Sequence, residues 1–197
     1  MNKSRSQTAH SFAGSNDGFS LLETVVAAGI MATALVALGQ MVALSVANNQ
    51  SARTGTYAAV LAEQKMEQLR GLMWGYDALA LPLSDTSTNT ALPTDSPTGG
   101  TGLTPSPANA LTSNIAGYVD YVDRFGNIIG GGATAPANTV YVRRWSIEPL
   151  PSNPGNTLIL QVVVSKQVDR GTSDRAGSTL RLRDEARLTT VKTRKAQ

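Results

Sequence analysis

The chain has no cysteine and only one histidine, His10, among its 197 residues. The absence of thiols excludes disulfides, thiolate metal sites and a cysteine nucleophile. One histidine argues against a histidine metal site and against a catalytic triad. We find no pairing of a nucleophile with a base, so we expect no enzymatic activity, no cofactor and no bound metal.

Charged residues are also scarce, at 16% of the chain, which is low for a soluble domain. Residues 24–52 carry no charged side chain, and residues 19–47 are apolar apart from Glu23 and some uncharged polar groups. About 20 apolar residues suffice for a helix to cross the hydrocarbon core of a bilayer. The polar segment before the run, residues 1–18, is basic, which predicts a cytoplasmic N-terminus and an exported remainder.

Two simple interpretations of this apolar run are incomplete. A cleaved secretory signal has a shorter apolar core, followed by an A-x-A-like site, and here the run is longer without a clear site after it. A signal anchor explains the hydrophobicity and the orientation. It does not explain Glu23, because a carboxylate within a membrane segment is costly and usually functional.

The residues around Glu23 resemble a known family. A basic polar leader is followed by Gly18, Phe19, Ser-Leu-Leu at residues 20–22, Glu23 and the apolar run. This order resembles the class III signal of type IV pilins and type II secretion pseudopilins. The resemblance implies that a membrane aspartyl peptidase cuts between Gly18 and Phe19 on the cytoplasmic side. It also implies that the helix is kept and that Phe19 is N-methylated.

The spacing of Phe19 and Glu23 has a chemical consequence. After cleavage, the α-amine of Phe19 and the carboxylate of Glu23 would be four residues apart, on one face of a helix. They could neutralise each other within one subunit, or between neighbours in a filament, where an unpaired buried charge is very costly. In the family that the chain resembles, the pairing is between subunits. The alternative is a carboxylate that snorkels to the lipid surface.

A helical pattern continues beyond the apolar run, through residues 48–75. The apolar positions that recur near helical spacing are Tyr57, Leu61, Met66, Leu69 and Met73. The polar complement is Arg53, Glu63, Lys65, Glu67, Gln68 and Arg70. We expect one helix from Phe19 to Gly71, with Glu67 and Arg70 as a surface pair. The segment YAAVLAEQKMEQLRGLMW also resembles the helix of V-class minor pilins.

The remainder of the chain predicts a loop followed by a sheet. Residues 76–115 are rich in Pro, Thr and Ser, and we expect a partly disordered, solvated connector there rather than a glycosylated or partner-binding loop. Residues 116–197 contain the segments with strand patterns, which are Tyr118–Val122, Thr139–Ile147, Asn156–Val168 and Ser178–Val191. The predicted fold class is α+β. A long N-terminal helix packs its second half on a small antiparallel sheet of three or four strands, as in the pilin fold.

Candidate sites in the predicted head are weak. Gly130, Gly131 and Gly132 lack the helix and the Lys-Ser/Thr of a phosphate loop. Asp120 and Asp123 are expected on opposite faces of a strand and form no catalytic pair. Asp85 and Asp95 in the loop do not have the spacing of a calcium-binding EF-hand.

The last part of the chain is basic. Its cationic residues are Arg143, Arg144, Arg181, Arg183, Arg187, Lys192, Arg194 and Lys195. Contact with nucleic-acid phosphates at a pilus tip is one use for such residues. We favour a solvated sheet face with a frayed tail.

The family resemblance implies a function. The chain would be a minor pilin, processed by a prepilin peptidase that is also the N-methyltransferase, and it would assemble with other major and minor pilins. It would first lie in the inner membrane as a single-pass protein with a periplasmic head, and then in a pilus. A minor pseudopilin of the type II secretion system is one alternative. A membrane-anchored exported binding module without a filament role is another.

Overall fold

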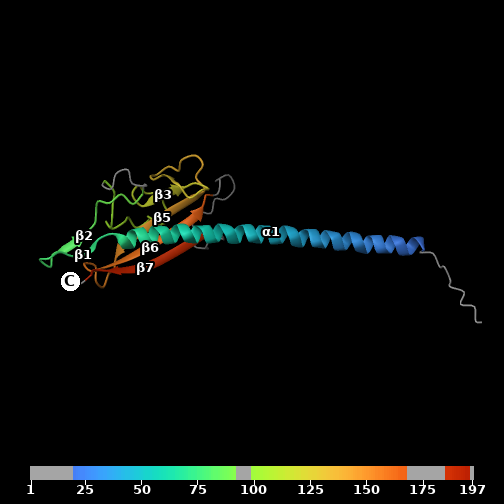
Figure 1. Ribbon diagram of the computed structural model, residues 1–197, viewed down its shortest axis with the longest axis horizontal. Coiled ribbons are helices and arrows are strands. Elements are labelled where there is room, and N and C mark those ends of the chain that lie inside the picture. Colours follow the sequence, from blue (N-terminus) through green and yellow to red (C-terminus); the bar gives the residue numbers. More distant parts are fainter. Residues whose placement is uncertain (1–19, 92–98, 168–184, 196–197) are drawn as a thin grey trace, which may run out of the picture. The chain divides into compact units, whose positions relative to one another are not determined.

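The computed structural model describes residues 20–91, 99–167 and 185–195 (Figure 1). By its internal contacts the chain divides into two units, Met1–Ala47 and Asn48–Gln197. Helix α1 (Leu21–Gly71) contributes to both units and has 51 residues. The second unit, which we call the head, also contains all the strands found among the described residues.

The apolar part of α1 is uncovered. α1 is long enough and apolar enough to cross a membrane, and its most apolar stretch has no buried residue in the structure. Buried positions along the helix begin only at Ala58. The same helix therefore has an apolar first half without a packing partner among the described residues and a second half that belongs to a protein core.

The head contains a five-stranded antiparallel sheet in the order β4-β3-β5-β6-β7. Its strands are β3 (Val119–Val122), β4 (Ile128–Gly130), β5 (Tyr141–Pro149), β6 (Thr157–Lys166) and β7 (Glu185–Thr193). A separate hairpin pairs β1 (Trp74–Tyr76) with β2 (Pro82–Ser84). The turn between β5 and β6 is the Pro/Asn/Gly-rich segment that the sequence favours as a hairpin turn.

The core of the head lies between α1 and one face of this sheet (Figure 1). Alternate residues of β6 are buried on that face, namely Leu158, Leu160, Val162 and Val164. Opposite them, α1 presents Leu61 and Leu69 together with the small residues Ala58 and Ala62. Burial of each large aliphatic side chain contributes about 1.5–3 kcal/mol, so this layer is the main source of hydrophobic stabilisation in the head.

The predicted α+β class is confirmed, with one long apolar helix against an antiparallel sheet. α1 ends at Gly71, as the sequence indicates. Met73, expected on the apolar helix face, lies beyond the helix and is 55% exposed. The sheet has more strands than expected because the short strand β4 follows a tight turn after β3. Of the last predicted strand, residues 178–184 lie outside the described residues.

The expectation of a solvated connector at residues 76–115 is wrong at several described positions. Strand β2 lies within it, and Ala91, Leu103 and Ala110 are buried in the core. Their burial is possible in a polar segment because backbone groups find partners, as when Leu103 N donates to Asp85 O at 2.7 Å. Residues 92–98 lie outside the described residues.

Candidate functional site

The first described residues form the N-terminus of α1. Gly18 and Phe19 lie outside the described residues, so the predicted cleavage and methylation remain predictions. The hydroxyl oxygen of Ser20 accepts a hydrogen bond from the backbone N–H of Glu23 at 3.2 Å. Ser20 is therefore the N-cap, and Ser20-x-x-Glu23 has the spacing of a capping box. That spacing is visible in the sequence, but our sequence analysis did not use it.

Glu23 consequently lies in the first turn of α1. A carboxylate there interacts favourably with the positive end of the helix dipole. The apolar side chains beside it are open, since Leu21 is 83% and Leu22 72% exposed. An apolar surface of this extent normally marks contact with a membrane or with other proteins. Glu23 thus lies in the first turn of the helix and also on an exposed apolar surface of the kind that contacts a membrane or another protein.

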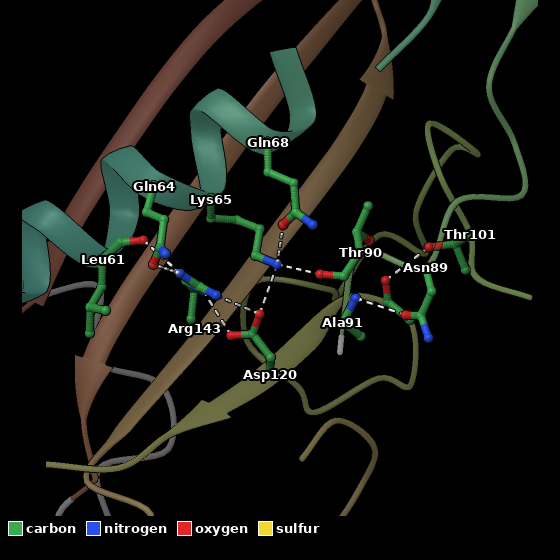
Figure 2. Close-up of polar contacts among 11 residues, drawn as sticks. Leu61, Gln64, Lys65, Gln68, Asn89, Thr90, Ala91, Thr101, Asp120 and Arg143 are labelled. Atoms are coloured by element: carbon green, nitrogen blue, oxygen red, sulfur yellow. Dashed lines mark hydrogen bonds and ion pairs between the residues drawn. The ribbon is translucent and has the colours of Figure 1, made fainter. Parts of the chain in front are cut away.

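A second polar arrangement fastens the other half of α1 to the sheet (Figure 2). Lys65 from α1 and Arg143 from β5 both contact the carboxylate of Asp120 on β3. Lys65 Nζ lies 2.8 Å from Asp120 Oδ2, and Arg143 Nε lies 2.8 Å from Asp120 Oδ1. Arg143 Nη2 donates a further hydrogen bond to Asp120 Oδ2 at 2.9 Å. We call Lys65, Asp120 and Arg143 the ion cluster.

The remaining donors of the ion cluster also have partners. Arg143 Nη1 donates to the backbone oxygen of Leu61 at 3.0 Å and to Gln64 Oε1 at 3.1 Å. Lys65 Nζ donates to Gln68 Oε1 at 2.8 Å and to the backbone oxygen of Thr90. The cluster therefore joins α1, β3, β5 and the segment around Thr90, as Figure 2 shows.

Lys65 is buried to an unusual degree for a lysine, with 0% exposure. Burial, together with the nearby charge of Arg143, lowers the pKa of Lys65 to about 8 against the opposing effect of Asp120. The ammonium group also lies 4.2 Å from the centre of the Trp145 ring, which is a cation–π contact. Two cations and one anion leave one excess positive charge in the interior, so Asp120 is the member on which both others depend.

The ion cluster was not predicted from the sequence. Lys65 was expected on the polar face of the helix and Arg143 on a solvated sheet face, and both expectations are wrong because each side chain is buried. Asp120 and Asp123 were expected on opposite faces, and of the two only Asp120 is buried in the core. Burial of a charge depends on partners that are distant in sequence, and residue type alone argues for exposure.

The expected frayed basic tail is also wrong at two described positions. Arg194 lies 3.7 Å from the centre of the Trp74 ring, and its Nη1 donates to the backbone oxygens of Gly75 and Leu83 at 2.9 and 3.0 Å. Lys192 Nζ donates to the backbone oxygen of Arg70 at the end of α1. Arg181 and Arg183 lie outside the described residues. The predicted Glu67–Arg70 pair is confirmed at 2.8 Å, and it is exposed.

The other candidate residues have local structural roles. Asp85 accepts hydrogen bonds from the backbone N–H groups of Ser87 and Thr88 and so closes a turn. Asp95 lies outside the described residues, and Gly130 ends strand β4. Among the residues that the structure describes, no three potential ligands come together as a metal site.

Comparison with family models, with curated proteins and with solved structures finds no match for this chain. The architecture is pilin-like, with a long N-terminal apolar helix packed on an antiparallel sheet. The arrangement can act as a structural element, because the ion cluster fastens the second half of α1 to the sheet and the apolar first half of α1 is exposed.

Removal of Asp120 should be more harmful than removal of Lys65. Asp120→Ala leaves two buried cations without their anion, and we expect a loss of about 3–5 kcal/mol in the free energy of unfolding. Lys65→Met removes the excess positive charge and keeps the Asp120–Arg143 pair, so it should cost less. Urea unfolding of the full chain in detergent, followed by the fluorescence of the two tryptophans of the head, Trp74 and Trp145, measures both.

Glu67→Ala is the matched control, because it breaks an exposed pair and should change the free energy of unfolding by less than about 1 kcal/mol. Equal losses for Asp120→Ala and Lys65→Met would contradict the central position of Asp120.

The stability should also depend on pH through Lys65. Its folded pKa is about 8 and its ordinary value is 10.5, so between these values the folded state binds fewer protons than the unfolded state. The contribution of Lys65 to the free energy of unfolding therefore rises with pH across this window. Wild type should gain stability relative to Lys65→Met as the pH rises.

Burial also raises the pKa of Tyr118 and Tyr121. Both tyrosines are present in the two proteins, so their contributions cancel in the difference. A flat or falling difference contradicts the prediction.

Proposed function

We propose that the chain is a minor pilin, which a prepilin peptidase processes between Gly18 and Phe19 and which then takes part in type IV pilus assembly as a priming or tip component. The observation that carries the proposal concerns the two halves of α1. The apolar first half is exposed, and the ion cluster fastens the second half to the sheet. The role is structural rather than enzymatic.

The position of Glu23 supports the assembly role. Cleavage would leave the α-amine of Phe19 four residues before the carboxylate, directly before the N-cap Ser20 at which the helix begins. In apolar surroundings the carboxylate needs a cation, and the amine of a neighbouring subunit can supply one when the helices are in register. Lateral packing of the apolar helices would then bury the surface that a single chain leaves open.

The head supports the same role through its connection to α1. Lys65 lies on α1 and is held by Asp120 and Arg143 from the sheet, so a force on the helix is passed directly to the sheet. Before assembly the subunit would lie in the inner membrane with the head in the periplasm. Crosslinking in cells distinguishes the machines: capture of pilins supports a pilus, and capture of secretion pseudopilins supports the pseudopilin alternative.

Mass spectrometry of the mature chain tests the processing step. We expect its first residue to be Phe19 with one methyl group on the α-amine, because the leader is removed and the new N-terminus is modified. Gly18→Leu should block the cleavage. Gly14→Leu, the same change within the leader, should leave it intact. A mature protein that retains Met1, or one cut after Ala47, would refute the proposal.

Glu23→Ala tests the pairing of charges during assembly. The variant should be exported and cleaved normally, but its share in sheared filaments should fall at least about tenfold, as a loss of 1.4 kcal/mol or more implies. Glu63→Ala removes an exposed carboxylate from the same helix within the head and should assemble normally. Immunoblots of the filament and membrane fractions measure both, and normal incorporation of Glu23→Ala excludes the pairing mechanism.

A further inference from the structure

A basic pocket lies at the end of the head where β5 begins. Its volume is about 390 Å³. Its walls include Arg53 and Tyr57 from α1, Arg124 from the turn after β3, and Tyr141 from β5. The two tyrosine rings lie 5.4 Å apart. The pocket thus combines guanidinium groups with aromatic rings, and no carboxylate is among its lining residues.

The positive charge at this pocket is not neutralised within the described part of the chain, where neither Arg53 nor Arg124 forms an ion pair. Lys166, which is exposed and is the register partner of Tyr141, adds a third cation at the same end of the sheet, where Glu185 of β7 is the register partner of the preceding residue, Ser165. The carboxylate next to Arg124 is that of Asp123, and its two oxygens accept hydrogen bonds within the turn. The surface is therefore suited to an anion from outside the chain.

The turn beside the pocket, at residues 123–127, exposes the aromatic ring of Phe125 to solvent. Asp123 Oδ1 accepts hydrogen bonds from Phe125 N at 2.7 Å and Asn127 N at 2.9 Å. Gly126 has a φ of 92°, and a Cβ there would lie 2.7 Å from the hydroxyl of Tyr57, so this position requires glycine. Phe125 is 71% exposed, and the guanidinium of Arg124 lies 4.6 Å from its ring centre. A fixed turn thus presents a cation and an apolar ring together.

The place of Arg53 in the sequence indicates what this surface meets. Arg53 is the first charged residue after the uncharged run at 24–52. A helix that crosses a bilayer leaves the hydrocarbon core where its apolar run ends, here at Ala47, and the polar residues 48–51 then lead to Arg53 in the layer of headgroups. Aromatic rings are enriched in that layer, and anionic lipids attract arginine and lysine to it.

We propose that Arg53, Arg124 and Phe125 form a docking surface for anionic phospholipid headgroups. The arginines contact the lipid phosphates, and the ring of Phe125 enters the interface beside them. The inference rests on the proposed function in one respect, namely that α1 spans a membrane before assembly. Its consequence is that the lipid surface fixes the rotation of the whole subunit about the axis of α1, and hence the face that the head offers to an arriving subunit.

The test uses the full chain with Phe125→Cys, which carries the only thiol because the wild type has no cysteine. A small environment-sensitive dye on this thiol replaces the phenyl ring. The protein is placed in lipid nanodiscs of phosphatidylcholine alone, or of phosphatidylcholine with phosphatidylglycerol. We expect the dye emission to shift to the blue in the anionic discs. The control is the same dye on Leu79→Cys, a residue 79% exposed at the β1–β2 hairpin, and it should give the same emission in both lipids.

Adding Arg53→Gln and Arg124→Gln should abolish the shift at position 125, and unchanged fluorescence of Trp74 and Trp145 shows that the head remains folded. Emission at position 125 that is equal in the two lipids, or a shift that survives both arginine substitutions, overturns the inference. A shift caused by inorganic phosphate in neutral discs also overturns it, in favour of a small free anion. A chain that does not co-elute with the discs overturns both this inference and the membrane-spanning step of the proposed function, whereas co-elution without a shift overturns the inference alone.

Discussion

The carboxylate of Asp120 determines how α1 lies on the sheet. Hydrophobic packing is non-directional, so the aliphatic side chains of α1 and β6 leave the helix some freedom to slide or rotate. The ion cluster removes this freedom of the helix, because Lys65 and Arg143 must both reach one carboxylate in the interior. A displacement of one helical turn would leave a buried charge unpaired, at a cost of several kcal/mol. The pilin-like architecture of the head is therefore specified by charge as well as by apolar burial.

The parts of the fold that depend on local pattern were accessible from the sequence. The absence of charged side chains over residues 24–52 indicates an apolar helix long enough to cross a membrane, and Gly71 marks its end. The strand segments are visible because β-branched residues and turn residues alternate along the second half of the chain. The segment at β6 is the clearest example, since its aliphatic residues occupy the face that α1 covers.

The parts of the fold that depend on partners distant in the sequence could not be predicted from it. Lys65, Asp120 and Arg143 are ordinary surface residues by type, and only their meeting in space explains their burial. Ala91 and Leu103 lie in a Pro/Thr/Ser-rich segment whose composition argues against a core, yet both are buried. In contrast, the residues most informative about function, Gly18 and Phe19, are conspicuous in the sequence and lie outside the described residues.

The contacts of Arg194 have a consequence for the order in which the head forms. This residue stacks on Trp74 and donates to backbone oxygens of β1 and β2, although it follows every helix and strand of the structure along the chain. The hairpin that comes directly after α1 therefore gains these contacts only once the ribosome has added a residue that follows β7. Closure of the head along this edge thus depends on synthesis of the whole sheet.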